Sequence, residues 1–116
     1  NAEDPENNFL PSPGKIDTLI LPGGPGVRID THIYPGYVIG PFYDSMVAKL
    51  IVHGKNRDEA IKIMLRALDE FEIGPIKTTV ALHKEILNHP IFLKGTVTTH
   101  FLEKIKKSEA DTKENL

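Results

Sequence analysis

Cysteine is absent from the 116 residues of this sequence. Its absence excludes disulfides, thiolate nucleophiles and zinc sites built on cysteine, and it is typical of proteins in a reducing compartment. The sequence also lacks a run of about 20 apolar residues, the length that a bilayer-spanning helix needs, and no charged-then-apolar leader opens it. We therefore expect a soluble, cytoplasmic protein.

An excess of charge of one sign is missing too. The sequence has 14 Lys and Arg residues and 16 Asp and Glu residues, for a net charge of −2. This balance gives no general attraction to nucleic acid or to an anionic membrane, so neither is an expected partner. The sequence starts at Asn1, within a polar segment, and we expect it to be a piece of a longer polypeptide.

Histidine remains as a possible metal ligand. No two of the five histidines have the spacing of three intervening residues that pairs metal ligands on one face of a helix. The sequence therefore predicts no metal site. The histidines are His32, His53, His83, His89 and His100.

The first half of the sequence has the pattern of short strands joined by turns. Residues 1–14, rich in Pro and Asn, predict a loop that is ordered only by docking. Residues 15–21 predict a strand with Ile16, Thr18 and Ile20 on one face. In residues 27–33 apolar and polar side chains alternate strictly, so one face is buried and the other, with Arg28, Asp30 and His32, faces water.

Two turns separate these strands. Residues 22–26, Pro-Gly-Gly-Pro-Gly, can reverse the chain so that the two strands form a hairpin. A Gly-rich loop can also hold phosphate, but that use favours a loop that leads into a helix, and here a strand follows. Residues 34–37 predict a type II turn, followed by a third short strand at 37–39.

The stretch from Pro41 to His53 is the centre of the predicted fold. Residues 46–53 carry one strong charge, at Lys49, which favours a strand with most of both faces covered, although a buried helix fits a short apolar run as well. Gly54 ends the run and a helix start follows. We take residues 46–53 as the central strand.

The second half has the three- and four-residue spacing of helices. Asn56 with Glu59 resembles a capping box, and an apolar stripe then predicts four helical turns, ended by Gly74-Pro75. Thr78 or Thr79 caps a second helix that stops before Pro90. Pro90 begins a further turn closed by Gly95. A last helix starts after Thr98 or Thr99. The inward residues of the three main helices are Ala60, Ile61, Met64, Leu65, Leu68, Phe71, Leu82, Ile86, Leu87, Phe101, Leu102 and Ile105.

Strands first and helices second predict an α+β domain: a small antiparallel meander with amphipathic helices packed on one side. The domain extends over residues 1–105, and the charged segment 106–116 is an expected disordered tail.

No single motif describes a complete active site. Asp44 could be a nucleophile or a metal ligand, but an Asp at the start of a strand more often accepts backbone N–H groups in an Asx-turn. Lys49 could be a catalytic amine, or it pairs with a carboxylate or extends to a sheet edge. Arg28, Asp30 and His32 could form a site or a partner interface, or be solvated.

Five ordered blocks of the sequence resemble the C-terminal domain of biotin carboxylase, particularly the form that is a separate subunit in bacterial acetyl-CoA carboxylase. The resemblance extends over about residues 1–105, and blocks in this order are far more specific than any one of them. The blocks are residues 1–5 (NAEDP), 9–16 (FLPSPGKI), 23–24 with 26–28 (GG and GVR), 42–46 with 48–51 (FYDSM and AKLI) and 76–79 (IKTT).

The resemblance implies a ligase that uses ATP and magnesium to carboxylate a biotin, attached to a carrier protein, with bicarbonate. In that family the ATP-grasp part precedes this domain, and the biotin-facing Arg lies just before the block that begins at Asn1. It follows that no catalytic residue and no cofactor site is expected within this sequence. The expected partners are the ATP-grasp part of the same chain, a second copy, the biotin carboxyl carrier protein and the carboxyltransferase.

The resemblance also assigns roles to three residues. The Gly-Gly-(aromatic)-Gly-Val-Arg loop of the family contributes to a homodimer contact, which implies that role for Arg28 and for the position of Pro25. Proline at this position lacks the family's aromatic ring. Asp44 matches an acidic residue toward the dimer and the active site, and we expect it to support one of the two.

Two alternatives stay open. Pyruvate and propionyl-CoA carboxylases share the Tyr-Asp block but differ around residues 11–15, which favours the acetyl-CoA type. The second alternative is a self-standing binding module, such as a biotin carrier. A carrier needs its lysine at an exposed hairpin tip, whereas Lys49 lies within an apolar run.

Overall fold

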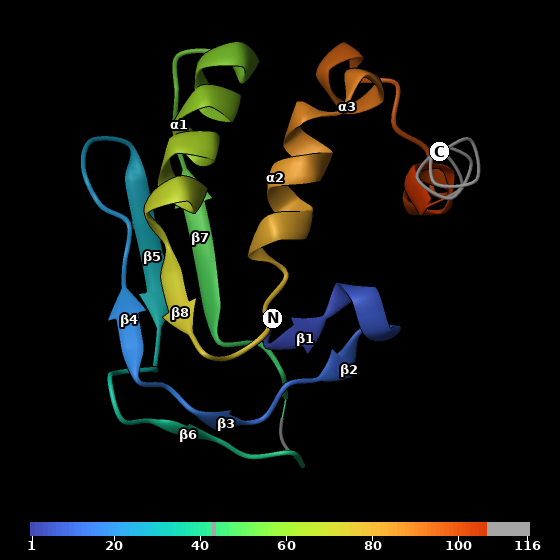
Figure 1. Cartoon of the computed structure of the whole chain (residues 1–116). Coiled ribbons are helices and arrows are strands. Elements are labelled where there is room, and N and C mark those ends of the chain that lie inside the picture. Colours follow the sequence, from blue (N-terminus) through green and yellow to red (C-terminus); the bar gives the residue numbers. More distant parts are fainter. Residues whose placement is uncertain (43, 107–116) are drawn as a thin grey trace, which may run out of the picture.

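The computed structural model describes residues 1–42 and 44–106 of the chain (Figure 1). Its elements are β1 (Glu3–Asp4), the 3-10 helix η1 (Pro5–Asn7), β2 (Leu10–Pro11), β3 (Gly14–Lys15), β4 (Thr18–Ile20), β5 (Val27–Thr31), β6 (Val38–Ile39), β7 (Ala48–Val52), α1 (Arg57–Glu70), β8 (Glu72–Gly74), α2 (Val80–Asn88) and α3 (Pro90–Lys94). Residues 101–106 are also helical. Tyr43 and residues 107–116, most of the predicted tail, lie outside the described residues.

Within the described residues, the strands form four separate antiparallel pairs: β1 with β2, β3 with β6, β4 with β8, and β5 with β7. The predicted α+β class and the antiparallel pairing are confirmed. The predicted hairpin between residues 15–21 and 27–33 is wrong, because β4 and β5 each pair with a later strand, and this order is not that of a meander. The loop 22–26 leads from one pair to another instead of reversing a strand onto itself.

Residues 15–21 form two short strands rather than one. β3 pairs with β6, and β4 pairs with β8, which follows α1 in the chain. Ile16 lies between them and is fully buried, but Ile20 is 49% exposed. The predicted common face of Ile16, Thr18 and Ile20 is therefore wrong. Leu19, half-buried, is the residue of β4 that packs on the core.

The β5–β7 pair is the longest and has one covered and one open face. Inner-face residues of both strands are half-buried, and α1 packs on this pair (Figure 1). Strict alternation in β5 confirms the prediction for residues 27–31. The predicted central strand begins at Ala48 rather than Met46, and its two faces are not both covered, since Ile51 is 45% exposed.

Helix α1 begins where the local pattern predicts it, but it ends at Glu70 rather than at Gly74-Pro75, because residues 72–74 form β8 and pair with β4. The Asn56 side chain accepts a hydrogen bond from the Glu59 N–H at 2.9 Å, and the Glu59 carboxylate accepts one from the Lys55 N–H at 3.3 Å. These bonds satisfy donors that the first turn leaves free. Ile61 and Leu68 of the predicted stripe are buried, and so is Ala67, which the prediction did not include.

The later helices follow the prediction, with one correction at Leu102. Thr79 is the residue before α2, but its hydroxyl makes no cap bond; Thr78 Oγ1 accepts from the Val80 N–H instead, at 3.3 Å. Pro90 begins α3 and Gly95 ends it, as predicted. In residues 101–106, Phe101 and Ile105 are buried but Leu102 is 45% exposed, so it does not face inward.

Residues 1–12 are folded onto the main core. Ala2 is buried beside Ile16, Ile33, Ile39, Val47 and Ile76. The Ala2 N–H donates to the Ser45 carbonyl and the Ser12 N–H donates to the Ala2 carbonyl, both at 2.8 Å. The expected loop therefore contains two short paired strands. Within the described part of the chain, no helix has the length and apolar character needed to cross a bilayer.

Candidate functional site: two interaction surfaces

The first surface is the open face of the β5–β7 pair, which we call the outer face: Arg28, Asp30, Lys49 and Ile51. Arg28 lies opposite Ile51, and Asp30 lies opposite Lys49. The Arg28 guanidinium donates to Asp30 through Nε at 3.2 Å and Nη2 at 3.0 Å. This bonding raises the pKa of Arg28 above its ordinary value. The outer face thus presents a fixed pair of opposite charges beside an exposed isoleucine.

The predicted Arg28, Asp30 and His32 trio is only partly brought together. Arg28 and Asp30 form an ion pair, whereas His32 packs edge-on against Tyr37, with ring centroids 5.4 Å apart. Tyr37 also meets Tyr34 in the same arrangement, at 5.3 Å. His32 therefore belongs to an aromatic cluster beyond the end of β5.

Asp44 adopts the turn geometry that the sequence favours. Its Oδ1 accepts a hydrogen bond from the Met46 N–H at 3.0 Å, as in an Asx-turn. The neighbouring Ser45 hydroxyl donates to Glu3 at 3.0 Å. Asp44 is exposed, so this bond leaves the outer part of its carboxylate facing solvent.

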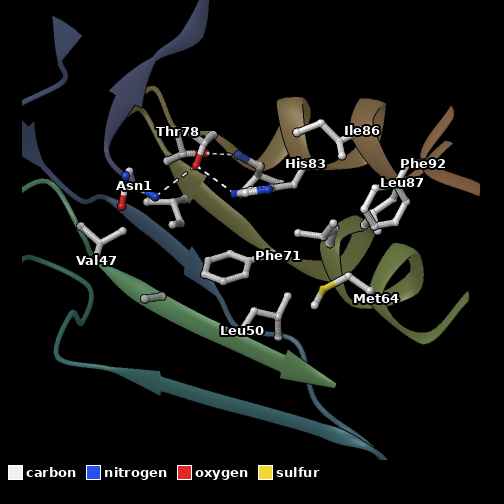
Figure 2. A pocket seen from close by; sticks show the side chains of 15 residues that line it. Asn1, Val47, Leu50, Met64, Phe71, Thr78, His83, Ile86, Leu87 and Phe92 are labelled. Carbon is white, nitrogen blue, oxygen red and sulfur yellow. Dashed lines mark hydrogen bonds between the residues drawn. The ribbon is translucent and has the colours of Figure 1, made fainter. Parts of the chain in front are cut away.

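The second surface is an apolar groove of about 280 Å³ between β7, α1 and α2. Phe71, Leu50 and Met64 extend into it from one side and Leu87 from the other (Figure 2). The full lining is Asn1, Val47, Ala48, Leu50, Met64, Leu68, Phe71, Ile73, Thr78, Thr79, Val80, His83, Ile86, Leu87 and Phe92. An open groove with such a lining is suited to receive apolar groups.

One end of the groove is polar. The Asn1 amine donates to Thr79 Oγ1 at 3.1 Å, and the Thr79 N–H donates to the Asn1 carbonyl at 3.1 Å. The same hydroxyl lies 3.4 Å from Nε2 of His83 (Figure 2). Loss of water around the His83 ring lowers its pKa, and the nearby amine adds to this effect.

The groove was not predicted from the sequence. Its polar end depends on residues 78 positions apart, Asn1 and Thr79. Only the spacing of Thr79 and His83, four residues apart at a helix start, is a local signal. The outer face, by contrast, follows from strand alternation. In residues 1–42 and 44–106, no group of three or more His, Asp or Glu side chains is arranged to hold a metal ion.

The chain matches known proteins over most of its length. Residues 1–104 match the family described as biotin carboxylase C-terminal domain. Biotin carboxylase 1 of Bacillus subtilis is 55% identical over 103 residues, which are 89% of this chain and 23% of that protein. A pyruvate carboxylase subunit of Methanothermobacter thermautotrophicus is 49% identical over 107 residues, 92% of this chain and 22% of that protein.

A solved structure agrees with the fold. The dimer of the biotin carboxylase domain of Hydrogenobacter thermophilus 2-oxoglutarate carboxylase, in complex with MgADP, ADP and bicarbonate, superposes with a TM-score of 0.87 at 42% identity. The match covers 90% of this chain and 23% of that one. This chain thus spans about a quarter of the length of the relatives it matches.

Proposed function

Because the chain belongs to the biotin carboxylase C-terminal domain family, we propose that it is the C-terminal domain of a cytoplasmic ATP-dependent biotin carboxylase. The whole protein carboxylates a carrier-bound biotin with bicarbonate, the first half-reaction of acetyl-CoA carboxylase in fatty-acid synthesis. Support comes from relatives about half identical in sequence that are named biotin carboxylase, and from the MgADP and bicarbonate bound in the Hydrogenobacter thermophilus structure.

Among the described residues, no three carboxylate or imidazole side chains are arranged to hold a metal ion. The Gly-rich loop 22–26 leads into β5 rather than into a helix whose N-terminus could hold phosphate. We place the binding of ATP, magnesium, bicarbonate and biotin in the remainder of the whole protein. The role of this chain is to bind that remainder and a second copy.

The observation that carries this role is the open apolar groove beside the N-terminus. Among the described residues β7 pairs only with β5, so its other edge is free, and Asn1 lines the groove at that side. The matched family is a C-terminal domain, and the relatives are about four times longer than their matched parts. The occupant is therefore the part of the whole protein that precedes this domain, where the resemblance also places the ATP-grasp part.

The outer face is the proposed homodimer contact. Arg28 is exposed on it and already oriented by Asp30, and Pro25 is exposed in the preceding loop. A relative with 42% identity has been solved as a dimer. Asp44 supports the contact or the active site from the neighbouring loop. The carrier protein and the carboxyltransferase complete the proposed set of partners.

A pyruvate carboxylase is the second candidate, because one relative of 49% identity has that name. The first candidate, the acetyl-CoA type, predicts that the whole protein, mixed with carrier and carboxyltransferase from its own source, carboxylates acetyl-CoA rather than pyruvate. The reverse outcome would select the second candidate.

The test of activity compares the whole protein with this chain alone. We expect biotin- and bicarbonate-dependent ATP turnover from the whole protein and none from the isolated chain in a coupled ATPase assay. Turnover by the isolated chain that survives repurification would refute our placement of the active site.

The test of the groove uses cysteine labelling in the whole protein, since this chain has no cysteine of its own. His83 and Asn88 are both exposed on α2 here, but only His83 lines the groove. After His83→Cys and Asn88→Cys, alkylation mapped by mass spectrometry should be slow at position 83 and fast at position 88. Equal rates would show that the groove stays open in the whole protein.

A further inference from the structure

The loop 22–26 carries Pro25 and leads directly to Arg28, so its conformation decides how both are presented. Two of its glycines lie in the left-handed region, Gly24 at φ 102° and Gly26 at φ 74°. Glycine backbones move over a wide range of φ and ψ, so a loop of this composition is ordered only where other groups hold it. The structure shows two such attachments.

The first attachment is to His53, the residue that follows β7. The His53 N–H donates to the Gly26 carbonyl at 2.8 Å, and a Cβ atom at Gly26 would lie 2.6 Å from the His53 carbonyl oxygen. Within the loop, the Val27 N–H donates to the Gly24 carbonyl at 3.2 Å. These contacts fix the end of the loop next to β5, but not its beginning.

The second attachment is to two side chains of α1. Arg66 Nη1 donates to the Gly23 carbonyl at 3.3 Å, and the Gly23 N–H donates to Glu70 Oε2 at 3.4 Å. Arg66 and Glu70 are themselves joined at 2.8 Å. The guanidinium also lies against the loop, since a Cβ at Gly24 would stand 3.7 Å from Arg66 Nη2. Both backbone groups of Gly23 are thereby bound by one ion pair.

We propose that Arg66 and Glu70 are positioning residues for self-association: they hold the loop 22–26 in the form that presents Pro25 and Arg28 to a second copy. This inference rests on the homodimer contact proposed above. An exposed ion pair one helical turn apart adds little to the stability of a fold. Its effect appears in binding, because a loop that is already ordered loses less conformational freedom when two surfaces meet.

The experiment measures the dimer dissociation constant of the whole protein by analytical ultracentrifugation. Arg66→Met should raise the dimer dissociation constant about five-fold, the effect expected from the loss of one hydrogen bond. Glu70→Gln should raise it less, because its amide oxygen still accepts from Gly23. Lys62→Met, which removes the same charge one turn earlier on α1, is the matched control and should change nothing. Arg66→Lys, which can still donate to the Gly23 carbonyl, should restore most of the affinity.

Two further readouts separate positioning from general stability. The melting temperature of Arg66→Met should equal that of Lys62→Met, and the Gly23 amide should exchange hydrogen faster in Arg66→Met. A lower melting temperature alongside the weaker dimer would overturn the inference in favour of a structural role. An unchanged dimer in Arg66→Met, with a weakened one in Arg28→Glu, would overturn it and leave the contact at Arg28 in place. If neither Arg66→Met nor Arg28→Glu changes the dimer dissociation constant, both this inference and the proposed dimer contact are wrong.

Discussion

Arg28 and Asp30, two residues apart on β5, lie side by side on the outer face and are joined by two hydrogen bonds of 3.2 and 3.0 Å. Alternate residues of a strand share a face, so this pairing follows from the strand itself. Their side chains are 72% and 48% exposed, and such pairs contribute little to folding. The pair fixes the direction of Arg28 instead, which is what a contact residue requires.

The first prediction follows from this exposure. Arg28→Glu should leave the melting temperature of the chain within about 2 °C, as at ordinary surface sites. In the whole protein it should raise the dimer dissociation constant roughly 30-fold or more, if Arg28 is a central anchor. Analytical ultracentrifugation of both whole proteins decides this. Equal dimer constants would make Arg28 a solvated charge and would indicate that Pro25 marks a real loss of the family's interface.

The outer face and the helices were predictable because their causes are local. Alternation over five residues places Arg28 outward, and the cap at Asn56 with the following stripe sets α1. The strand pairing was not predictable in this way. β4 pairs with β8, more than fifty residues later, because burial of Leu19 and Ile73 beside the main core decides the partner, and no local pattern encodes that choice.

The groove, like the strand pairing, was not predictable from local sequence patterns. Leu50, Met64 and Leu87 each have the spacing of ordinary core residues, and the sequence assigned the two helical ones to the core. Whether they meet one another or leave a gap depends on how α2 is placed against β7. The contacts of α2 with its surroundings join residues far apart in the chain: Asn1 bonds to Thr79 at the start of α2, and Lys84 of α2 lies 2.9 Å from Asp69 of α1.

The second prediction concerns the main core. Ile16 is fully buried, whereas Ile20, four residues later, is 49% exposed. Ile16→Val should lower the free energy of unfolding by about 1 kcal/mol, since it removes a methyl group that close packing does not replace. Ile20→Val is the matched control and should stay within about 0.5 kcal/mol of the parent. Urea unfolding of the three proteins measures the difference, and equal losses would place Ile16 outside the core.

The third prediction concerns pH. In the isolated folded chain the pKa of His83 lies below its ordinary value of 6.5, because the groove removes part of the water around its ring and the Asn1 amine repels its charge. The unfolded chain therefore binds the proton more readily. Above about pH 6.5 His83 is neutral in both states, and the free energy of unfolding is not affected by it. As the pH falls below about 6.5, proton binding favours the unfolded chain and the free energy of unfolding decreases.

The difference between the parent and His83→Gln isolates this effect. Urea unfolding at pH 8 and at pH 5.5 should show that the parent loses more stability on acidification than the variant does. Equal losses would mean that His83 is as well hydrated when folded as when unfolded.

The last prediction is that the isolated chain folds by itself but with a small margin. α1 covers the inner face of the β5–β7 pair, which gives a core, yet the free edge of β7 and the apolar groove remain open to water. We expect a free energy of unfolding of about 3–5 kcal/mol, at the low end for domains of this size. Open edges also pair with one another, so the chain should associate as its concentration rises. Urea unfolding at low concentration, with sedimentation over a concentration series, measures both. A non-cooperative transition at low concentration would show that the preceding part of the whole protein, which we propose as the occupant of the groove, is needed for folding itself.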